Sequence, residues 1–207
     1  MKMNLPNKLS VLRLVMVPIF MVVMLLPVFT DFSSTADMIL TLSGAVLFIA
    51  ASFTDMLDGK IARKYNLVTD FGKFLDPLAD KFMVIGAMLC ILFTQAGNLN
   101  MFTRYFFALV VVVFRELAVT SIRLVASSSG GVVIAANMLG KLKTVTQIVA
   151  ICAAIIGPVI YQAAKLDVKL LGSPPVTLVT TALMIYLTIH SGINYIVGAW
   201  KYLDPQK

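Results

Sequence analysis

The sequence predicts an all-α integral membrane protein with six transmembrane helices, and two observations carry that prediction. The chain of 207 residues has a mean hydropathy of +0.93 and only 13% charged residues, whereas soluble domains contain about 25%. Apolar runs of nearly 20 residues, the length that crosses a bilayer as a helix, recur along the whole chain. Because these runs are continuous rather than alternating, they indicate helices rather than the strands of a barrel.

The first three expected helices surround an acidic stretch. The first covers roughly 10–29 and contains Pro18, which a membrane helix tolerates. Its basic flank resembles that of a signal peptide. A signal peptide is not expected, however, because the apolar run is too long and five further spans follow. The second and third cover roughly 37–57 and 78–96, and the residues between them that would let the chain turn back are Gly59, Asn66 and Gly72.

The last three expected helices cover roughly 104–125, 143–162 and 176–199. The fourth carries arginine within an apolar run, and two lysines stand at the entry of the fifth. The sixth ends at Trp200 and Tyr202, aromatic side chains that are typical of a membrane–water interface. No sequence repeat, low-complexity tract or long linker divides the chain, so residues 1–207 are expected to form a single domain.

The distribution of positive charge predicts the orientation. With both termini in the cytoplasm, thirteen Lys and Arg lie on the inner side and three, Arg104, Lys165 and Lys169, on the outer side. The net charge of +7 therefore indicates topology and attraction to membrane lipids with anionic headgroups. No soluble basic patch exists, so no nucleic-acid partner is expected. We expect a multi-pass protein of the plasma membrane with its acidic stretch at the cytoplasmic end.

Half of the ten acidic residues lie in the stretch 55-DMLDGKIARKYNLVTDFGKFLDPLADK-81. Asp55 and Asp58 are three positions apart and Asp76 and Asp80 are four apart, so each pair shares one helix face. If the two helices pack as an antiparallel hairpin, these four carboxylates converge near the membrane surface. Their mutual repulsion then requires cations, and all-oxygen ligation suits two hard divalent ions, Mg²⁺ or Mn²⁺. Asp70 is expected to lie in a solvated loop.

The same stretch matches the pattern D-x2-D-G-x2-A-R-x8-G-x3-D-x3-D with every gap correct. It resembles the CDP-alcohol phosphotransferase family, and the six-span layout extends this resemblance over nearly the whole chain. The resemblance implies that a CDP-linked lipid donates its phosphatidyl group to an alcohol while CMP leaves. It also implies that the four aspartates bind two divalent metals and that Asp80 is the catalytic base. The expected CDP-lipid-binding residues are Pro6, Asn7, Lys8, Leu9, Gly59, Ala62, Arg63, Thr69 and Gly72.

Cationic side chains near the later spans bear on the acceptor alcohol. Arg115 lies at depth in 114-FRELAVTSIRL-124, where an unpartnered arginine is costly. Glu116 leaves the helix about 100° away, so Arg115 is expected to face a polar cavity. Together with Lys141, Lys143 and Arg123 it would form an anion pocket beside the metals. An acceptor that carries its own phosphate needs such a pocket, whereas serine or choline does not.

Three segments are similar to the branch of the family that uses a glycerol phosphate acceptor: the Arg-Glu pair at 115–116, 140-GKLKTVTQ-147 and 4-NLPNKLSVLR-13. The expected donor is CDP-diacylglycerol, the acceptor sn-glycerol 3-phosphate and the product phosphatidylglycerol phosphate. Two alternatives within the family are a CDP-dependent cardiolipin synthase and a phosphatidylinositol phosphate synthase. A cation-coupled transporter, from a different class, would spread its acids over several helices at mid-depth. Gly192 and Gly198 permit close helix contact and hence a homodimer, but they locate no face for it.

Overall fold

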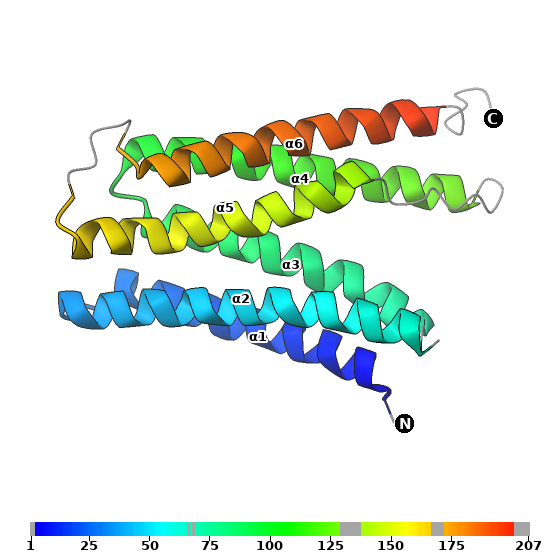
Figure 1. Cartoon of the computed structure of the whole chain (residues 1–207), viewed down its shortest axis with the longest axis horizontal. Coiled ribbons are helices and arrows are strands. Elements are labelled where there is room, and N and C mark those ends of the chain that lie inside the picture. The colour runs from blue at the N-terminus through cyan, green and yellow to red at the C-terminus, as the bar shows by residue number, and fades with distance from the viewer. Residues whose placement is uncertain (1–2, 66, 68, 129–137, 167–171, 201–207) are drawn as a thin grey trace.

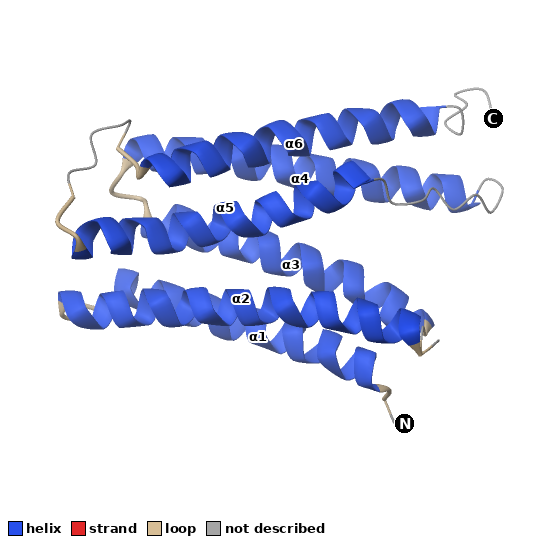
Figure 2. Ribbon diagram, in the orientation of Figure 1, coloured by secondary structure: helices blue, strands red, loops and turns tan. Residues whose placement is uncertain are grey.

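Six helices account for nearly all of the computed structural model, which describes residues 3–65, 67, 69–128, 138–166 and 172–200. Each is long and apolar enough to cross a membrane, and Figure 2 shows only loops between them in the described part of the chain. The prediction of an all-helical chain with six candidate spans is confirmed. The helices are α1 (Leu5–Phe29), α2 (Ser34–Lys64), α3 (Asp70–Thr94), α4 (Leu99–Ser128), α5 (Met138–Ala163) and α6 (Pro175–Ala199).

Side-chain caps explain why the first three helices begin where they do. The side chains of Asn4, Ser33 and Thr69 each accept a hydrogen bond from a backbone N–H three residues further on, which satisfies a donor that the helix itself leaves unpaired. The helices predicted from the sequence were therefore too short. Helix α2 continues to Lys64 and α3 already begins at Asp70, so the chain turns within a few residues instead of across the acidic stretch.

The helices form two groups that pack side by side, with one helix crossing between them. In Figure 1, α1 and α2 lie along one edge of the bundle, α4, α5 and α6 along the other, and α3 crosses between them. Helix α1 packs against both α2 and α3 far more extensively than these two pack against each other. The two helices of the expected α2–α3 hairpin are thus held together mainly through α1, and they contact each other directly only to a small extent. The start of α1 and the end of α6 lie at the same end of the bundle (Figure 1).

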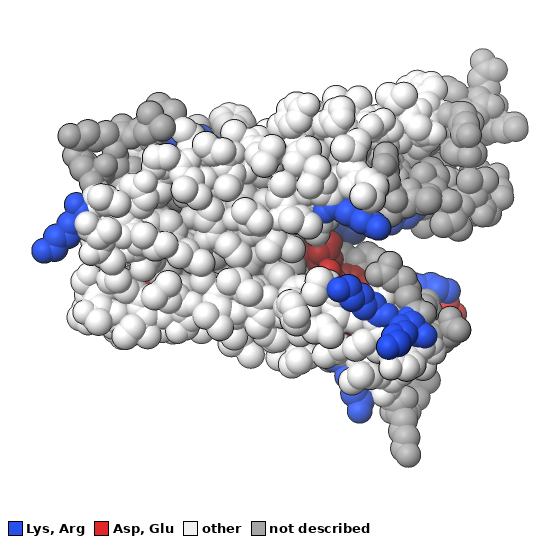
Figure 3. Space-filling view, in the orientation of Figure 1, with Lys and Arg blue, Asp and Glu red and all other residues white. Residues whose placement is uncertain are grey.

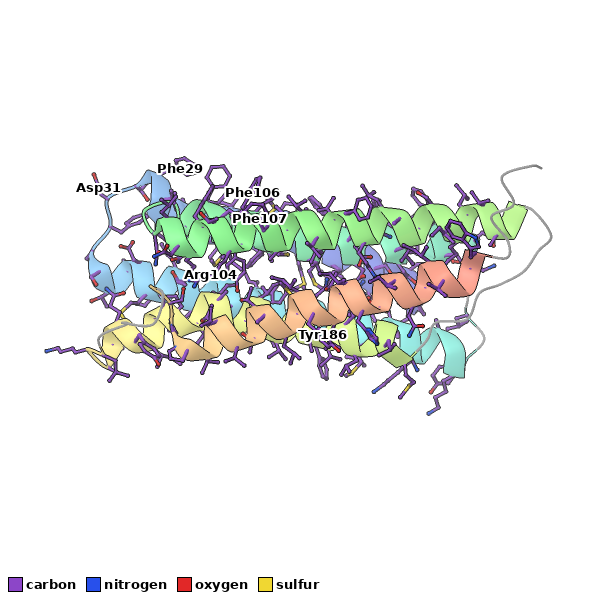
Figure 4. The ribbon with its side chains drawn as sticks, turned by 90° about the horizontal axis from the view of Figure 1, so that it is seen from above. Phe29, Asp31, Arg104, Phe106, Phe107 and Tyr186 are labelled. Atoms are coloured by element: carbon purple, nitrogen blue, oxygen red, sulfur yellow. The ribbon has the colours of Figure 1, made fainter. Side chains whose placement is uncertain are left out.

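The core between the helices is apolar and closely packed. Phe20 of α1 and Phe48 of α2 meet with their ring centroids 5.8 Å apart. A Cβ atom at Gly44 would lie only 2.4 Å from the sulfur of Met24, so glycine lets α1 and α2 approach closely. On the outside the apolar side chains are exposed, as lipid contact allows. Figure 4 shows Phe106 and Phe107 pointing outward from α4, near the end of the bundle where Phe29 and Asp31 lie.

A buried tyrosine joins the second group of helices. Tyr105 of α4 is 1% exposed; its hydroxyl donates to the Ala150 carbonyl of α5 at 3.3 Å and accepts a hydrogen bond from Thr181 of α6 at 2.9 Å. A buried phenol needs such partners because no water is present to replace them. These contacts fix α4, α5 and α6 relative to one another and so support the site that the three helices help to form.

Candidate active site

A cavity of about 1080 Å³ opens at the end of the bundle where α1 begins. Its walls come from the C-terminal turns of α2, the first turns of α3 and α5, and the C-terminal halves of α4 and α6. Figure 3 shows the hollow from the side, with acidic atoms at its floor and Lys and Arg atoms around its rim. Both charge types thus meet in this one hollow.

Three of the four predicted metal ligands line this cavity. They are Asp55 on α2 and Asp76 and Asp80 on α3. The side chain of Asp80 also lies close enough to Asp55, Glu116 and Lys143 for their charges to interact. Asp80 therefore lies between the acidic and the basic side chains of the cavity.

The fourth predicted ligand, Asp58, is buried at 3% exposure and is held by Arg13. Arg13 of α1 is fully buried; its Nη2 donates to Asp58, and its Nη1 lies 2.6 Å from a carboxylate oxygen of Asp55. One turn earlier, Ser10 donates a hydrogen bond to Asp76 at 2.5 Å. Helix α1 therefore reaches carboxylates on both α2 and α3, and this explains why it lies between them.

The donor chemistry of the aspartates fits a hard divalent cation. Oxygen Oδ1 of Asp80 is buried without a hydrogen-bond partner among the described residues, which is costly for a carboxylate unless a cation approaches it. In the described part of the chain, however, no three Asp, Glu, His or Cys side chains are close enough to share one ion. Metal binding by Asp55, Asp58, Asp76 and Asp80 thus stays a prediction, in which the carboxylates turn toward a common ion.

All four cations predicted to bind the acceptor phosphate line the same cavity: Arg115, Arg123, Lys141 and Lys143. Lys143 is buried at 4% exposure, whereas Lys141 is exposed at the start of α5. Arg123 lies over the ring of Tyr195, with its guanidinium carbon 5.8 Å from the ring centroid. Their phosphate-binding role is a prediction that their common position supports, because a phosphate needs several converging donors.

Arg115 also pairs with its neighbour Glu116, although the two side chains leave the helix in different directions. Nη1 of Arg115 donates to Oε1 of Glu116 at 3.1 Å, and Nζ of Lys143 donates to the same oxygen. The Cα–Cβ bonds of adjacent helical residues diverge by about 100°, but the long arginine side chain bends back far enough to meet the carboxylate. Arg115 still lines the cavity as expected.

A glycine of α6 makes room for Arg115. A Cβ atom at Gly192 would lie 3.1 Å from Cγ of Arg115, so the stem of the arginine passes directly over the α6 backbone. Gly192 is buried within the chain by this contact, and it does not present a surface to a second copy. The homodimer therefore stays a prediction without a located face.

The residues predicted to bind the CDP-lipid divide into two groups. Gly59 lines the cavity, and Ala62 lies half-buried further along the same helix. The others gather where the start of α1 meets the turn before α3: Thr69 donates to Asn7 at 3.0 Å, and a Cβ atom at Gly72 would lie 2.9 Å from Oδ1 of Asn7. Beside them Pro6 is buried, Leu9 half-buried and Lys8 exposed; the side chain of Arg63 lies outside the described residues.

Several residues at the site were missed by the sequence reasoning. Arg13 was counted only as a topology signal, although it closes the segment 4-NLPNKLSVLR-13 that carried part of the resemblance. Ser10 lies in the same segment, which was the available signal for both. Lys60 and Lys81, which were not among the predicted site residues, line the cavity as well.

Comparisons with known proteins identify the family. A family model for CDP-alcohol phosphatidyltransferases matches residues 3–203. The chain belongs to the CDP-alcohol phosphatidyltransferase family. It is therefore an enzyme, a transferase, and the resemblance found in the sequence is confirmed.

Relatives in this family come from several bacteria. A CDP-diacylglycerol–glycerol-3-phosphate 3-phosphatidyltransferase of Bacillus subtilis is 40% identical over 203 residues, which cover 97% of each chain. A probable phosphatidylglycerophosphate synthase of Mycobacterium tuberculosis is 33% identical over 96% of this chain and 82% of its own. A CDP-diacylglycerol–glycerol-3-phosphate 3-phosphatidyltransferase of Rickettsia bellii is 32% identical over 96% of this chain and 97% of its own. The similarity thus spans the whole six-helix CDP-alcohol phosphatidyltransferase fold.

Proposed function

We propose that this enzyme transfers the phosphatidyl group of CDP-diacylglycerol to sn-glycerol 3-phosphate, giving phosphatidylglycerol phosphate and CMP. The observation that carries the proposal is one cavity lined by three motif aspartates and by Arg115, Lys141 and Lys143. The named activity of the relatives supports the same substrates. Acids gathered at one end of the bundle also disfavour a transporter, for which carboxylates at mid-depth on several helices are typical.

Asp80 is the proposed general base. The primary hydroxyl of the acceptor gives its proton to the Asp80 carboxylate while its oxygen attacks the phosphorus next to diacylglycerol. The bond from that phosphorus to the bridging oxygen breaks, and CMP departs with the electron pair. Asp80 suits this role because it lines the cavity and because its charge interacts with Lys143, so the base lies near the proposed phosphate site.

Asp55, Asp58, Asp76 and Asp80 are the proposed ligands of two divalent ions, Mg²⁺ or Mn²⁺. When bound, the ions supply positive charge that offsets the pyrophosphate and the departing CMP. Within the chain, Arg13 orients Asp55 and Asp58, and Ser10 orients Asp76. Both residues are buried, so their contribution is to position carboxylates.

The acyl chains of the donor have a proposed path between α2 and α5. The cavity reaches Ile49 and Phe53 of α2 and Val145 of α5, which are all about half exposed. In Figure 3 the hollow opens on the face that these two helices share. A lipid with its headgroup in the cavity would leave its chains in the bilayer through this apolar side, without crossing a polar surface.

The cytoplasmic orientation of the site is part of the same proposal. The start of α1 and the end of α6 lie at the cavity end (Figure 1), where most of the Lys and Arg residues also lie, and positive charge favours the cytoplasmic side. We propose a single-domain, multi-pass enzyme of the plasma membrane whose water-soluble acceptor and CMP exchange with the cytoplasm.

A single assay series tests the proposal. The protein is purified in detergent with Mg²⁺ or Mn²⁺ and CDP-diacylglycerol, each acceptor is offered in turn, and CMP release is measured. We expect sn-glycerol 3-phosphate to be used, and inositol phosphate and phosphatidylglycerol to be poor acceptors. Preferential transfer to phosphatidylglycerol would instead make the enzyme a cardiolipin synthase and refute the proposed acceptor.

A further inference from the structure

Glu116 is the sole glutamate in the 207-residue chain, and it lies on α4 in the wall of the active-site cavity. Its side chain is 13% exposed. Oxygen Oε1 accepts hydrogen bonds from both Arg115 and Lys143. The carboxylate therefore lies among the cations that the proposed function assigns to the acceptor phosphate, and it weakens their attraction for any anion.

A carboxylate is an unexpected component of a phosphate pocket. It interacts repulsively with Asp80, and it offsets part of the positive charge of Arg115 and Lys143, with which it forms hydrogen bonds. The four cations assigned to the acceptor phosphate and Glu116 together leave three positive charges, one fewer than the cations alone would give. The pocket is thus not arranged for the strongest possible anion attraction.

The position of Glu116 suggests what its other oxygen contacts. Glu116 forms hydrogen bonds with Lys143 and Arg115, and its charge also interacts with that of Asp80. In the proposed reaction the acceptor phosphate lies at these cations and the reacting hydroxyl lies at Asp80. The middle carbon of a three-carbon acceptor, with its hydroxyl, then lies between these two ends, beside Glu116.

We propose that Glu116 determines acceptor specificity: its charge limits the binding of bare anions, and its oxygen Oε2 accepts a hydrogen bond from the acceptor's middle hydroxyl. This inference rests on the proposed function. A purely structural role, in which Glu116 only offsets the charge of buried Lys143, predicts a different result. Under that role, losing Glu116 would weaken the binding of every anion and lower the kcat/KM of every acceptor by the same factor.

Two substitutions separate the charge from the hydrogen bond. Glu116→Gln removes the charge but keeps a neutral acceptor oxygen of the same shape, and Glu116→Ala removes both. Asp31→Asn is the matched carboxylate-to-amide control, because Asp31 is exposed at the opposite end of the bundle. Each protein is assayed by CMP release at saturating CDP-diacylglycerol, with sn-glycerol 3-phosphate or with 3-hydroxypropyl phosphate, which lacks only the middle hydroxyl.

The wild-type enzyme is expected to prefer sn-glycerol 3-phosphate by about 10- to 100-fold in kcat/KM, the range for a hydrogen bond to a charged group. The preference falls to about onefold in Glu116→Ala and to an intermediate value in Glu116→Gln, while Asp31→Asn retains the wild-type ratio. An unchanged preference in Glu116→Ala, whatever the absolute rates, would overturn the hydroxyl contact.

Binding of inorganic phosphate tests the charge role without turnover. Titration calorimetry on the detergent-purified proteins, without donor or acceptor, is expected to give a Kd about three- to tenfold lower for Glu116→Gln than for the wild type, because one negative charge has left the pocket. An equal or weaker affinity overturns this role. The calorimetric result stands even if the wild type uses another acceptor, an outcome that would refute the proposed function separately.

Discussion

Replacing Arg13 of α1 with methionine removes the cation that pairs with Asp55 and Asp58 of α2. The guanidinium is fully buried between Asp55, at 2.6 Å, and Asp58, which is itself 3% exposed. Methionine has a similar length and fills much of the same space. The substitution therefore leaves two carboxylates facing each other with their countercharge removed.

The expected loss of stability follows from that geometry. Removing one partner of a buried ion pair costs about 3–5 kcal/mol, because the remaining charge stays desolvated. For a chain of about 200 residues this corresponds to a fall in melting temperature of about 6–20 °C. Saturating Mg²⁺ should restore part of the loss, since an ion bound by the aspartates would replace the missing positive charge.

The assay is thermal unfolding of the detergent-purified protein, with and without Mg²⁺. Arg123→Met is the matched control: this arginine is exposed, and its loss should change the free energy of unfolding by about 0.5 kcal/mol or less. Adding Asp58→Asn to Arg13→Met should recover at least about 1 kcal/mol, because neighbouring charges are coupled. If Arg13→Met and Arg123→Met have the same melting temperature, the ion pair does not hold α1 to α2 and the reasoning fails.

Three further predictions concern the cavity and the α1–α3 junction. Asp80→Asn should abolish CMP release while the enzyme still binds CDP-diacylglycerol in an equilibrium binding assay; turnover above about 1% of the wild-type rate would exclude Asp80 as the base. Gly192→Ala should displace Arg115, because the new Cβ would lie 3.1 Å from its Cγ, and should raise the KM for sn-glycerol 3-phosphate more than that for the donor; equal effects would exclude Arg115 from the acceptor site. Gly72→Ala should lower the free energy of unfolding by about 1–3 kcal/mol, because its Cβ would lie 2.9 Å from Oδ1 of Asn7. The measurement is the melting temperature, and a value equal to that of the wild type would show that Asn7 moves aside at little cost.

Much of the fold was predictable because bilayer physics leaves few choices. Apolar runs of sufficient length must become helices, so their number followed directly from composition. The positions of the helix ends could not be predicted in this way, because Gly59 and Gly72 were interpreted as turn residues. In the structure both lie inside helices, and Gly72 is needed for close approach to Asn7. A glycine alone does not distinguish a turn from a close helix contact.

The site was predictable where residue type and spacing carry the chemistry. The motif aspartates and the four cations could be identified from the sequence, and all but Asp58 line one cavity. The contacts of Arg13 with Asp55 and Asp58, and of Glu116 with Lys143, could not be predicted, because these partners are on other helices. An arginine near the start of a first span fits the positive-inside pattern equally well, and only the packing of α1 reveals the two carboxylates beside it.

The burial of Arg13 also constrains the order of biosynthesis. Its partner Asp58 follows 45 positions later, which the ribosome needs roughly 2–9 s to translate. During that interval α1 has emerged but its guanidinium has no carboxylate, so we expect it to remain at the membrane surface, where a long basic side chain can reach water. Helix α1 can settle at its final depth only when α2 arrives. The acidic end of α2 thus completes the insertion of the helix made before it.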